Sequence, residues 1–121
     1  MDYRMGAAEA RFAEIIWENA PLPSGELVKL SGDKLGWKKS TVYTVLRRLC
    51  EKGLFRNEGG AVTVLVDRES YEEGQSRQFV TESFGGSLPA FLAAFTARKK
   101  LSDKEIAELQ KLIDEAKEAK E

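Results

Sequence analysis

The sequence predicts a mainly α-helical protein with one small β-hairpin, divided into an N-terminal domain (residues 1–67) and a three-helix C-terminal domain (68–121). Three observations predict this fold class. Apolar residues recur at helical spacing along most of the chain. Two short β-prone runs are joined by a Gly-Gly pair, which is a strong hairpin signal. From residue 68 onward the pattern is purely helical.

The composition narrows the class of function. The 121 residues carry 19 Lys and Arg, 20 Asp and Glu and no His, and 42% of them are hydrophobic, which is typical of a globular chain. No apolar run approaches the roughly 20 residues that span a bilayer, and the N-terminus lacks a signal-peptide core. One cysteine and no histidine exclude the usual zinc ligand sets and His-based nucleophile pairs. We therefore expect a cytoplasmic binding protein without metal or cofactor, and not an enzyme.

The first two helices are predicted from apolar spacing and stop signals. A helix from Ala8 to Asn19 places Phe12, Ile15 and Ile16 on one face. Ser24 is the expected N-cap of a second helix, which weakens at Gly32. Residues 33–37 then form a short connection.

A third helix is predicted from Ser40, as its N-cap, to about Lys52. Its buried stripe comprises Val42, Val45, Leu46 and Leu49. Gly53 ends it, and strands at 54–58 and 61–66 follow, joined by Gly59-Gly60. Three helices followed by a hairpin is the order of a winged helix-turn-helix domain.

The C-terminal domain is predicted as three helices. Ser70 begins a capping box for a helix that ends near Phe84, before Gly85-Gly86. Ser87 caps the next helix, which carries Phe91 and Phe95. Ser102 begins a second capping box, for the final helix, whose apolar side includes Leu109, Ile113 and Ala116.

The third helix has the character of a DNA-reading element. Residues 38–56 carry a net charge of +5, with Glu51 as their single acid. Hydroxyl side chains near a helix start can reach base edges in a major groove, and long basic side chains can reach phosphates. The expected base contacts are Ser40, Thr41, Tyr43 and Thr44, and the expected phosphate contacts are Lys38, Lys39, Arg47 and Arg48. For Ser40, capping is the competing interpretation.

At these residues a family resemblance becomes specific. The run from Trp37 to Gly53 reads W-K-K-S-T-V-Y-T-V-L-R-R-L-C-E-K-G. It resembles the signature W-x-x-S/T-T-V-x-T-L-L-x-R-L-x-x-K-G of the penicillinase-repressor family, the BlaI, MecI and CopY transcriptional repressors. Residues 8–18, 76–79, 84–88 and 101–109 continue the likeness, which thus covers nearly the whole chain.

The resemblance implies a homodimeric repressor whose third helix enters the major groove of a palindromic double-stranded operator. The apolar faces of the C-terminal helices agree, because one 55-residue lobe can barely bury them and a second copy would supply the missing surface. A compact monomeric lobe packed on the winged helix is the competing interpretation. The expected dimer-interface residues are Phe79, Phe84, Phe91, Phe95, Leu109 and Ile113.

The chain departs from the family pattern in three places. Its wing tip, Gly59-Gly60, has no basic side chain, so at most the backbone amides approach the DNA. The paired Cys-x-Cys motifs of the copper-responsive branch are missing, and the lone Cys50 is expected to be a small packing residue. The resemblance implies derepression through a membrane sensor-protease system, but the matching scissile pair is Ala94-Phe95 instead of Asn-Phe.

An alternative function belongs to another class of protein. A winged-helix protein-interaction module would use the same basic helix to bind an acidic partner. Basic side chains interleaved with hydroxyls on one helix face favour DNA over this alternative.

Overall fold

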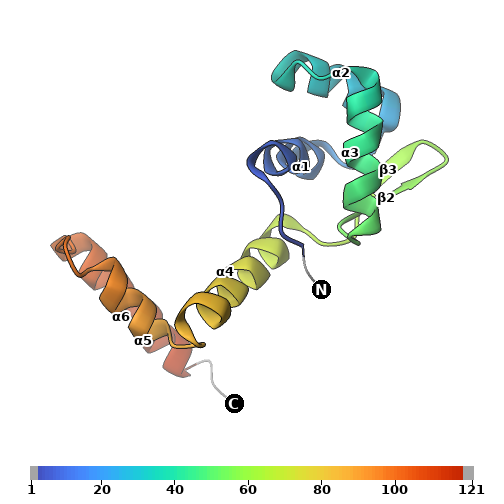
Figure 1. Ribbon diagram of the computed structural model, residues 1–121. Helices are drawn as coiled ribbons and strands as arrows, with labels where there is room; N and C mark the ends of the chain where they lie inside the picture. Colours follow the sequence, from blue (N-terminus) through green and yellow to red (C-terminus); the bar gives the residue numbers. More distant parts are fainter. Residues whose placement is uncertain (1–2, 119–121) are drawn as a thin grey trace. The chain divides into compact units, whose positions relative to one another are not determined.

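The predicted order of elements is present in the computed structural model, which describes residues 3–118 (Figure 1). Its elements are α1 (Ala7–Asn19), β1 (Leu22–Pro23), α2 (Ser24–Leu35), α3 (Lys39–Glu51), β2 (Phe55–Glu58), β3 (Ala61–Val64), α4 (Arg68–Phe84), α5 (Leu88–Phe95) and α6 (Asp103–Glu118). The predicted fold class, a winged helix followed by a helical domain, is confirmed. The chain forms two units, Met1–Gln78 and Phe79–Glu121, so α4 begins in the first and ends in the second.

The sheet of the first unit has three antiparallel strands in the order β1-β3-β2. Glu58 pairs with Ala61, so Gly59 and Gly60 form the predicted two-residue turn. Their φ angles of 56° and 82° suit glycine and match a type I′ turn. Strand β1 was not predicted from the sequence. It is two residues long and ends in a proline, which an edge strand tolerates.

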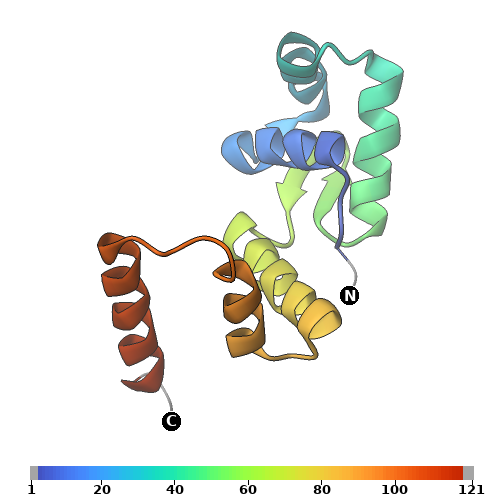
Figure 2. The same ribbon diagram turned by 60° about the vertical axis from the view of Figure 1, so that its left-hand side comes forward.

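The core of the first unit lies between the three helices and the sheet (Figures 1 and 2). Its side chains with at most 1% exposure are Phe12, Ala13, Ile16, Leu27, Val42, Leu46, Leu49, Leu54, Phe55 and Val62. They include most of the predicted α3 stripe, and Val45, at 8%, completes it. Trp37 stacks on Phe12 with ring centroids 5.1 Å apart, which holds the start of α3 against α1.

Two helix boundaries differ from the prediction. Ser24 is the first residue of α2 and does not cap it, because its hydroxyl bonds instead to the Tyr43 hydroxyl at 3.0 Å. Gly32 does not end α2, since the helix continues to Leu35 and stops at Gly36, where φ is 71°.

The start of α4 also differs from the prediction. The helix begins at Arg68, and its cap is Asp67, whose Oδ1 accepts a hydrogen bond from the Ser70 amide at 2.8 Å. The predicted capping box at Ser70 was therefore wrong by one turn.

The start of α4 is attached to α1. The indole N–H of Trp17 donates to the Val66 carbonyl at 2.9 Å, and its ring lies 5.4 Å from that of Tyr71. Arg68 forms an ion pair with Glu14 of α1. These contacts place the first turn of α4 in the first unit.

The helices of the second unit have the predicted caps. The Ser87 hydroxyl accepts from the Ala90 amide at 3.0 Å, and Ser102 and Glu105 form the predicted reciprocal capping box. No described residue of this unit is buried, whereas the first unit has a buried core. A groove of about 430 Å³ lies between α5 and α6. Over residues 3–118, no helix is long and apolar enough to span a membrane.

We predict that Ser31→Ala stabilises the first unit. Ser31 is fully buried in α2, and its hydroxyl has no hydrogen-bond partner among the described residues. Removing an unpaired buried hydroxyl and adding a better helix former should raise the free energy of unfolding by about 1 kcal/mol. Thermal melting followed by circular dichroism measures the effect.

Ser24→Ala is the matched control for this prediction. Ser24 is the other buried serine of α2, but its hydroxyl is bonded to Tyr43. The control should therefore lower the melting temperature. Equal shifts for the two variants would contradict the assignment.

Candidate nucleic-acid interface

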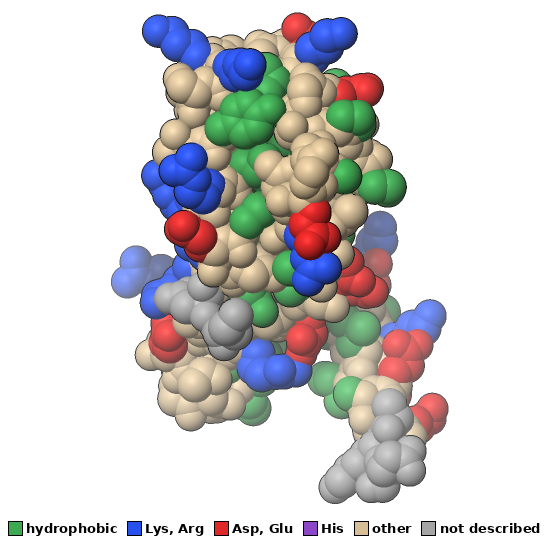
Figure 3. All heavy atoms as spheres, turned by 90° about the vertical axis from the view of Figure 1, so that its right-hand side faces the viewer, with side chains coloured by type: hydrophobic (Ala, Val, Ile, Leu, Met, Phe, Trp, Pro, Cys, Tyr) green, Lys and Arg blue, Asp and Glu red, His purple; other side chains and the backbone are tan. Residues whose placement is uncertain are grey.

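The face of α3 opposite its buried stripe carries the predicted contact residues. The exposed ones are Lys38, Lys39, Ser40, Thr41, Thr44, Arg47 and Arg48. Figure 3 views the side of the molecule on which α3 and the hairpin lie in Figure 1, and Lys and Arg side chains stand at the upper end and along the left flank of this side. Burial of Val42, Val45, Leu46 and Leu49 therefore orients the helix so that its hydroxyl and basic residues meet solvent together.

Helix α3 begins two residues earlier than predicted. Its first helical hydrogen bond runs from the Val42 amide to the Lys38 carbonyl at 3.0 Å, so Lys38 holds the cap position. No side chain caps this end, and the prediction of Ser40 as N-cap was wrong. The Ser40 hydroxyl is therefore not engaged in capping the helix.

The first turn of α3 also lacks an acidic residue and carries Lys39. Cations at the positive end of a helix dipole oppose helix formation. Helices α1, α2, α4 and α6 each have an acid in this turn. The arrangement does not favour the stability of α3 and is typical of a surface that binds anions.

Tyr43 differs in its surroundings from the other predicted base contacts. It is half-buried, packs against the core, and shares a hydrogen bond with Ser24. The Ser24 amide in turn donates to the Gly60 carbonyl at 2.7 Å. Tyr43 thus links α3 to the start of α2 and to the wing, a connection that the sequence analysis missed.

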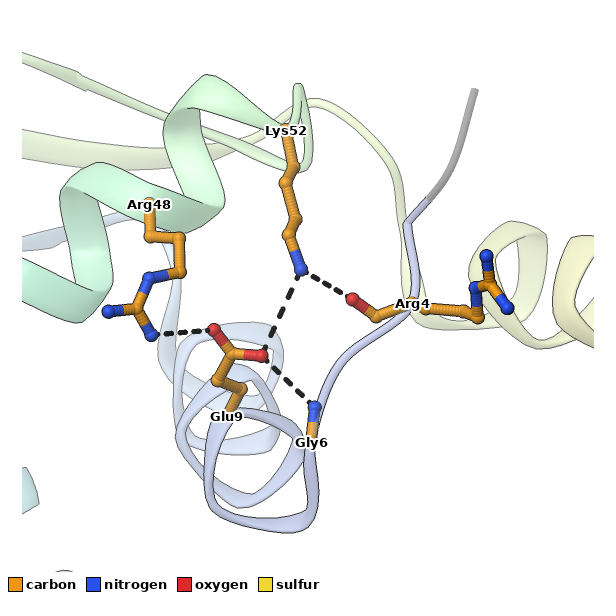
Figure 4. A network of polar contacts seen from close by, with 5 residues as sticks. All are labelled: Arg4, Gly6, Glu9, Arg48 and Lys52. Carbon is orange, nitrogen blue, oxygen red and sulfur yellow. Dashed lines mark hydrogen bonds and ion pairs between the residues drawn. The ribbon is translucent and has the colours of Figure 1, made fainter.

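The basic residues of α3 fall into two groups. Within residues 3–118, Lys38, Lys39 and Arg47 take part in no ion pair. Arg48 and Lys52 both face Glu9 of α1, with N–O distances of 3.0 and 3.8 Å (Figure 4). The sequence analysis missed Glu9, because its partners lie about 40 residues further along the chain.

The wing, which is the hairpin of β2 and β3, exposes backbone groups and few charged side chains. Gly59 and Gly60 are exposed at its tip, and Arg56 of β2 lies 3.9 Å from Glu58. The positive φ of Gly60 makes a side chain at this position strained. Exposed Ala61 is the neighbouring position that would accept a basic residue without this strain.

A small groove of about 260 Å³ lies between α3 and β2, lined by Tyr43, Leu46, Arg47, Cys50 and Asn57. Half-buried Cys50 forms part of its wall. Burial raises the pKa of the Cys50 thiol above its usual value, which keeps it protonated and unreactive at neutral pH. Among the described residues, no group of three or more His, Cys, Asp or Glu is placed to hold a metal ion.

The predicted dimer residues of the second unit include an aromatic cluster. Phe79, Phe84 and Phe91 meet edge to face with centroids 5.5–5.9 Å apart, and Phe95 lies 5.9 Å from Phe91. Leu109 and Ile113 both lie on α6, and Leu109 lines the groove between α5 and α6. The predicted cleavage pair Ala94-Phe95 ends α5, where both residues are exposed.

Comparison with known proteins gives the chain a family. The model of the penicillinase repressor family matches residues 5–115. The penicillinase repressor of Bacillus licheniformis is 30% identical over 117 residues, which cover 93% of this chain and 91% of that protein. The methicillin resistance regulatory protein MecI of Staphylococcus aureus (strain Mu50) is 23% identical over 116 residues, covering 93% and 94%. An uncharacterised 16.5 kDa protein of Latilactobacillus sakei is 26% identical over 88% of this chain and 75% of its own length.

We predict that the Glu9 network contributes stability that acid removes. The hydrogen bond from the Gly6 amide, followed by that from Arg48, holds the pKa of Glu9 below 4.5. A carboxyl with a lowered folded-state pKa stabilises the fold above its unfolded pKa and loses this effect as pH falls through the folded value. The melting temperature of the wild type should exceed that of Glu9→Gln at neutral pH, and the difference should shrink below pH 4.5. A difference that is unchanged in acid would contradict the assignment.

Proposed function

The chain belongs to the penicillinase repressor family, and from this premise we propose that it is a homodimeric transcriptional repressor that occupies a two-fold symmetric operator. Each protomer would insert α3 into a major groove. The protein would act by occupying its site and not by catalysis. A sensor-linked signal would release it, with Ala94-Phe95 as the candidate cleavage site. The observation that carries the proposal is the exposed face of α3, which carries Lys38, Lys39 and Arg47 beside the hydroxyls of Ser40, Thr41 and Thr44. Among residues 3–118, these three cations take part in no ion pair.

This face supports a division of contacts. Lys38 and Lys39 lie at the N-terminal end of α3, and Arg47 lies two turns further along. Hydroxyls accept or donate to base edges, and Thr methyl groups can contact the methyl group of thymine. Tyr43 would contribute its ring edge, since its hydroxyl is already bonded to Ser24.

The second unit supports the homodimer. The large apolar side chains that stay at least half exposed are Phe79, Leu88, Phe95, Ile106, Leu112 and Ile113, with exposed fractions between 51 and 62%. Exposed apolar side chains in such numbers mark an interaction surface. A second copy of the same helices offers matching apolar surface, because a two-fold interface is self-complementary.

The test of the proposal is light scattering with size-exclusion chromatography, on the protein alone and with genomic DNA fragments, followed by sequencing of the retained fragments. The repressor function requires a dimer that enriches a two-fold symmetric site. A monomer that retains no DNA at moderate salt would contradict it and would favour the protein-interaction module with an acidic partner.

We predict that Lys39→Ala and Thr44→Ala have different effects on DNA binding. Lys39→Ala removes a phosphate contact, so it should weaken binding to all sequences and reduce the salt slope by about one. Thr44→Ala should relax sequence preference at one base pair, at a cost of about 1–3 kcal/mol on the preferred site. Titrations at several salt concentrations measure both effects. Lys104→Ala in α6 is the control with the same charge change, and equal losses for Lys39→Ala and Thr44→Ala would refute the division.

We predict that Ile113→Glu weakens the dimer. Ile113 is 56% exposed in the single chain, and a carboxylate placed in an apolar interface loses its hydration. The dimer dissociation constant should rise at least tenfold, or about 1.4 kcal/mol. Light scattering over a range of concentrations measures it. Lys111→Glu on the opposite face of α6 is the control and should leave the dimer intact; the same change for both variants would contradict the interface.

A further inference from the structure

The C-terminal end of α3 meets the N-terminus of α1 through one carboxylate (Figure 4). Glu9 Oε2 lies 3.0 Å from an Arg48 guanidinium nitrogen, and Glu9 Oε1 lies 3.8 Å from Lys52 Nζ. Glu9 Oε1 also accepts a hydrogen bond from the Gly6 amide at 3.0 Å. Lys52 donates a further bond to the Arg4 carbonyl. A single acid therefore holds two of the cations of the DNA-facing helix.

These two cations lie on the flank of α3 that continues from a predicted base contact. Thr41, Arg48 and Lys52 are spaced by seven and four residues, which places them along one side of the helix. The Arg48 side chain is 53% exposed, Lys52 is 27% exposed and Glu9 is 16% exposed. A phosphate that follows this flank could thus reach Arg48 from solvent, while the Glu9 carboxylate stays on the inner side.

We propose that Glu9 is an internal competitor for the DNA phosphates, which lowers the contribution of Arg48 and Lys52 to DNA binding. The inference rests on the proposed function. A phosphate that approaches Arg48 must share it with a carboxylate already bound and is repelled by that charge. Hydrogen bonds from Gly6 and Arg48 lower the pKa of Glu9, so the carboxylate is ionised at neutral pH.

The competition sets the general affinity of the protein for DNA. Phosphate contacts are independent of sequence and supply nearly all of non-specific binding. Lys38, Lys39 and Arg47 remain without an ion pair in the described part of the chain, so they would provide the main electrostatic contribution. Because Arg48 and Lys52 are paired with Glu9, they would contribute less to non-specific binding. This would limit how much of the protein is retained on the large excess of DNA outside the operator.

The test is Glu9→Gln in the full chain, titrated with a mixed-sequence duplex about three helical turns long. Glutamine keeps an acceptor for the Gly6 amide, since a capping box accepts either residue. The variant should bind severalfold more tightly at moderate salt, with a salt slope steeper by about one. Adding Arg48→Ala to the variant should remove most of this gain. The variant is expected to be slightly less stable and yet to bind more tightly, so partial unfolding cannot produce the result.

Glu14→Gln is the matched control. Glu14 also lies on α1 and forms an ion pair with an arginine, but that partner is Arg68 of α4. The control makes the same change in net charge and leaves α3 untouched, so its affinity should change less than that of Glu9→Gln.

Three results would overturn the inference: equal gains for both variants, no gain for Glu9→Gln, or a loss of affinity, which would mean that Glu9 positions Arg48 for DNA. The wild-type titration separates this inference from the proposed function. A wild type that binds no duplex at any salt concentration overturns both. A wild type that binds DNA, together with a Glu9→Gln variant of unchanged affinity, overturns the competition alone.

The variant Arg48→Ala in the wild-type background gives a second measurement of the competition. It should cost less DNA affinity than Arg47→Ala.

Discussion

Burial of one side of α3 is the constraint on which the rest of the first unit depends. Val42, Val45, Leu46 and Leu49 pack against residues of α1, α2 and the sheet, and this packing fixes the rotation of the helix about its own axis. A rotation of 100° would replace apolar side chains in the core with hydroxyl and basic ones, at a cost far above the stability of a small domain. The exposed face is therefore presented in one orientation. The Trp37–Phe12 stack and the Tyr43–Ser24 hydrogen bond hold the same helix from two further directions.

The charges at the N-terminus of α3 oppose the formation of the helix, because they are positive where the helix dipole is positive. The first turn of α3 has no acid and no side-chain cap, although it begins with two lysines. The apolar stripe supplies the stability that these residues do not. Such a local conflict is expected where the surface serves binding instead of folding. At the C-terminal end of α3 the charges favour the helix, because the cations Arg48 and Lys52 lie near the negative end of its dipole. Both cations also pair with Glu9.

Most of the fold was predictable from the sequence, because five of its helices have a clear apolar period or a capping box and the hairpin has Gly-Gly at its turn. The errors at the helix starts were of one kind. Ser24, Ser40 and Ser70 are good caps by residue type, but the first helical hydrogen bond decides where a helix begins, and packing shifted it by one to three residues. Strand β1 was missed because two residues carry no period. The polar partners Glu9 and Ser24 depend on contacts between distant segments, and no local pattern marks them.

The two units differ in how far they bury their apolar side chains. Under the proposed function, this difference would connect the oligomeric state to DNA binding. The first unit buries a full core, whereas no described residue of the second is buried. A single α3, with three exposed cations that have no ion pair among residues 3–118, would give weak, salt-sensitive binding. Two copies joined through their second units would bind both half-sites, and the second contact would gain from the high effective concentration that the joint provides. Occupancy of a symmetric site would then depend on the apolar faces of α4, α5 and α6 as strongly as on α3. A signal that separates these faces could release the operator without altering any residue that contacts DNA.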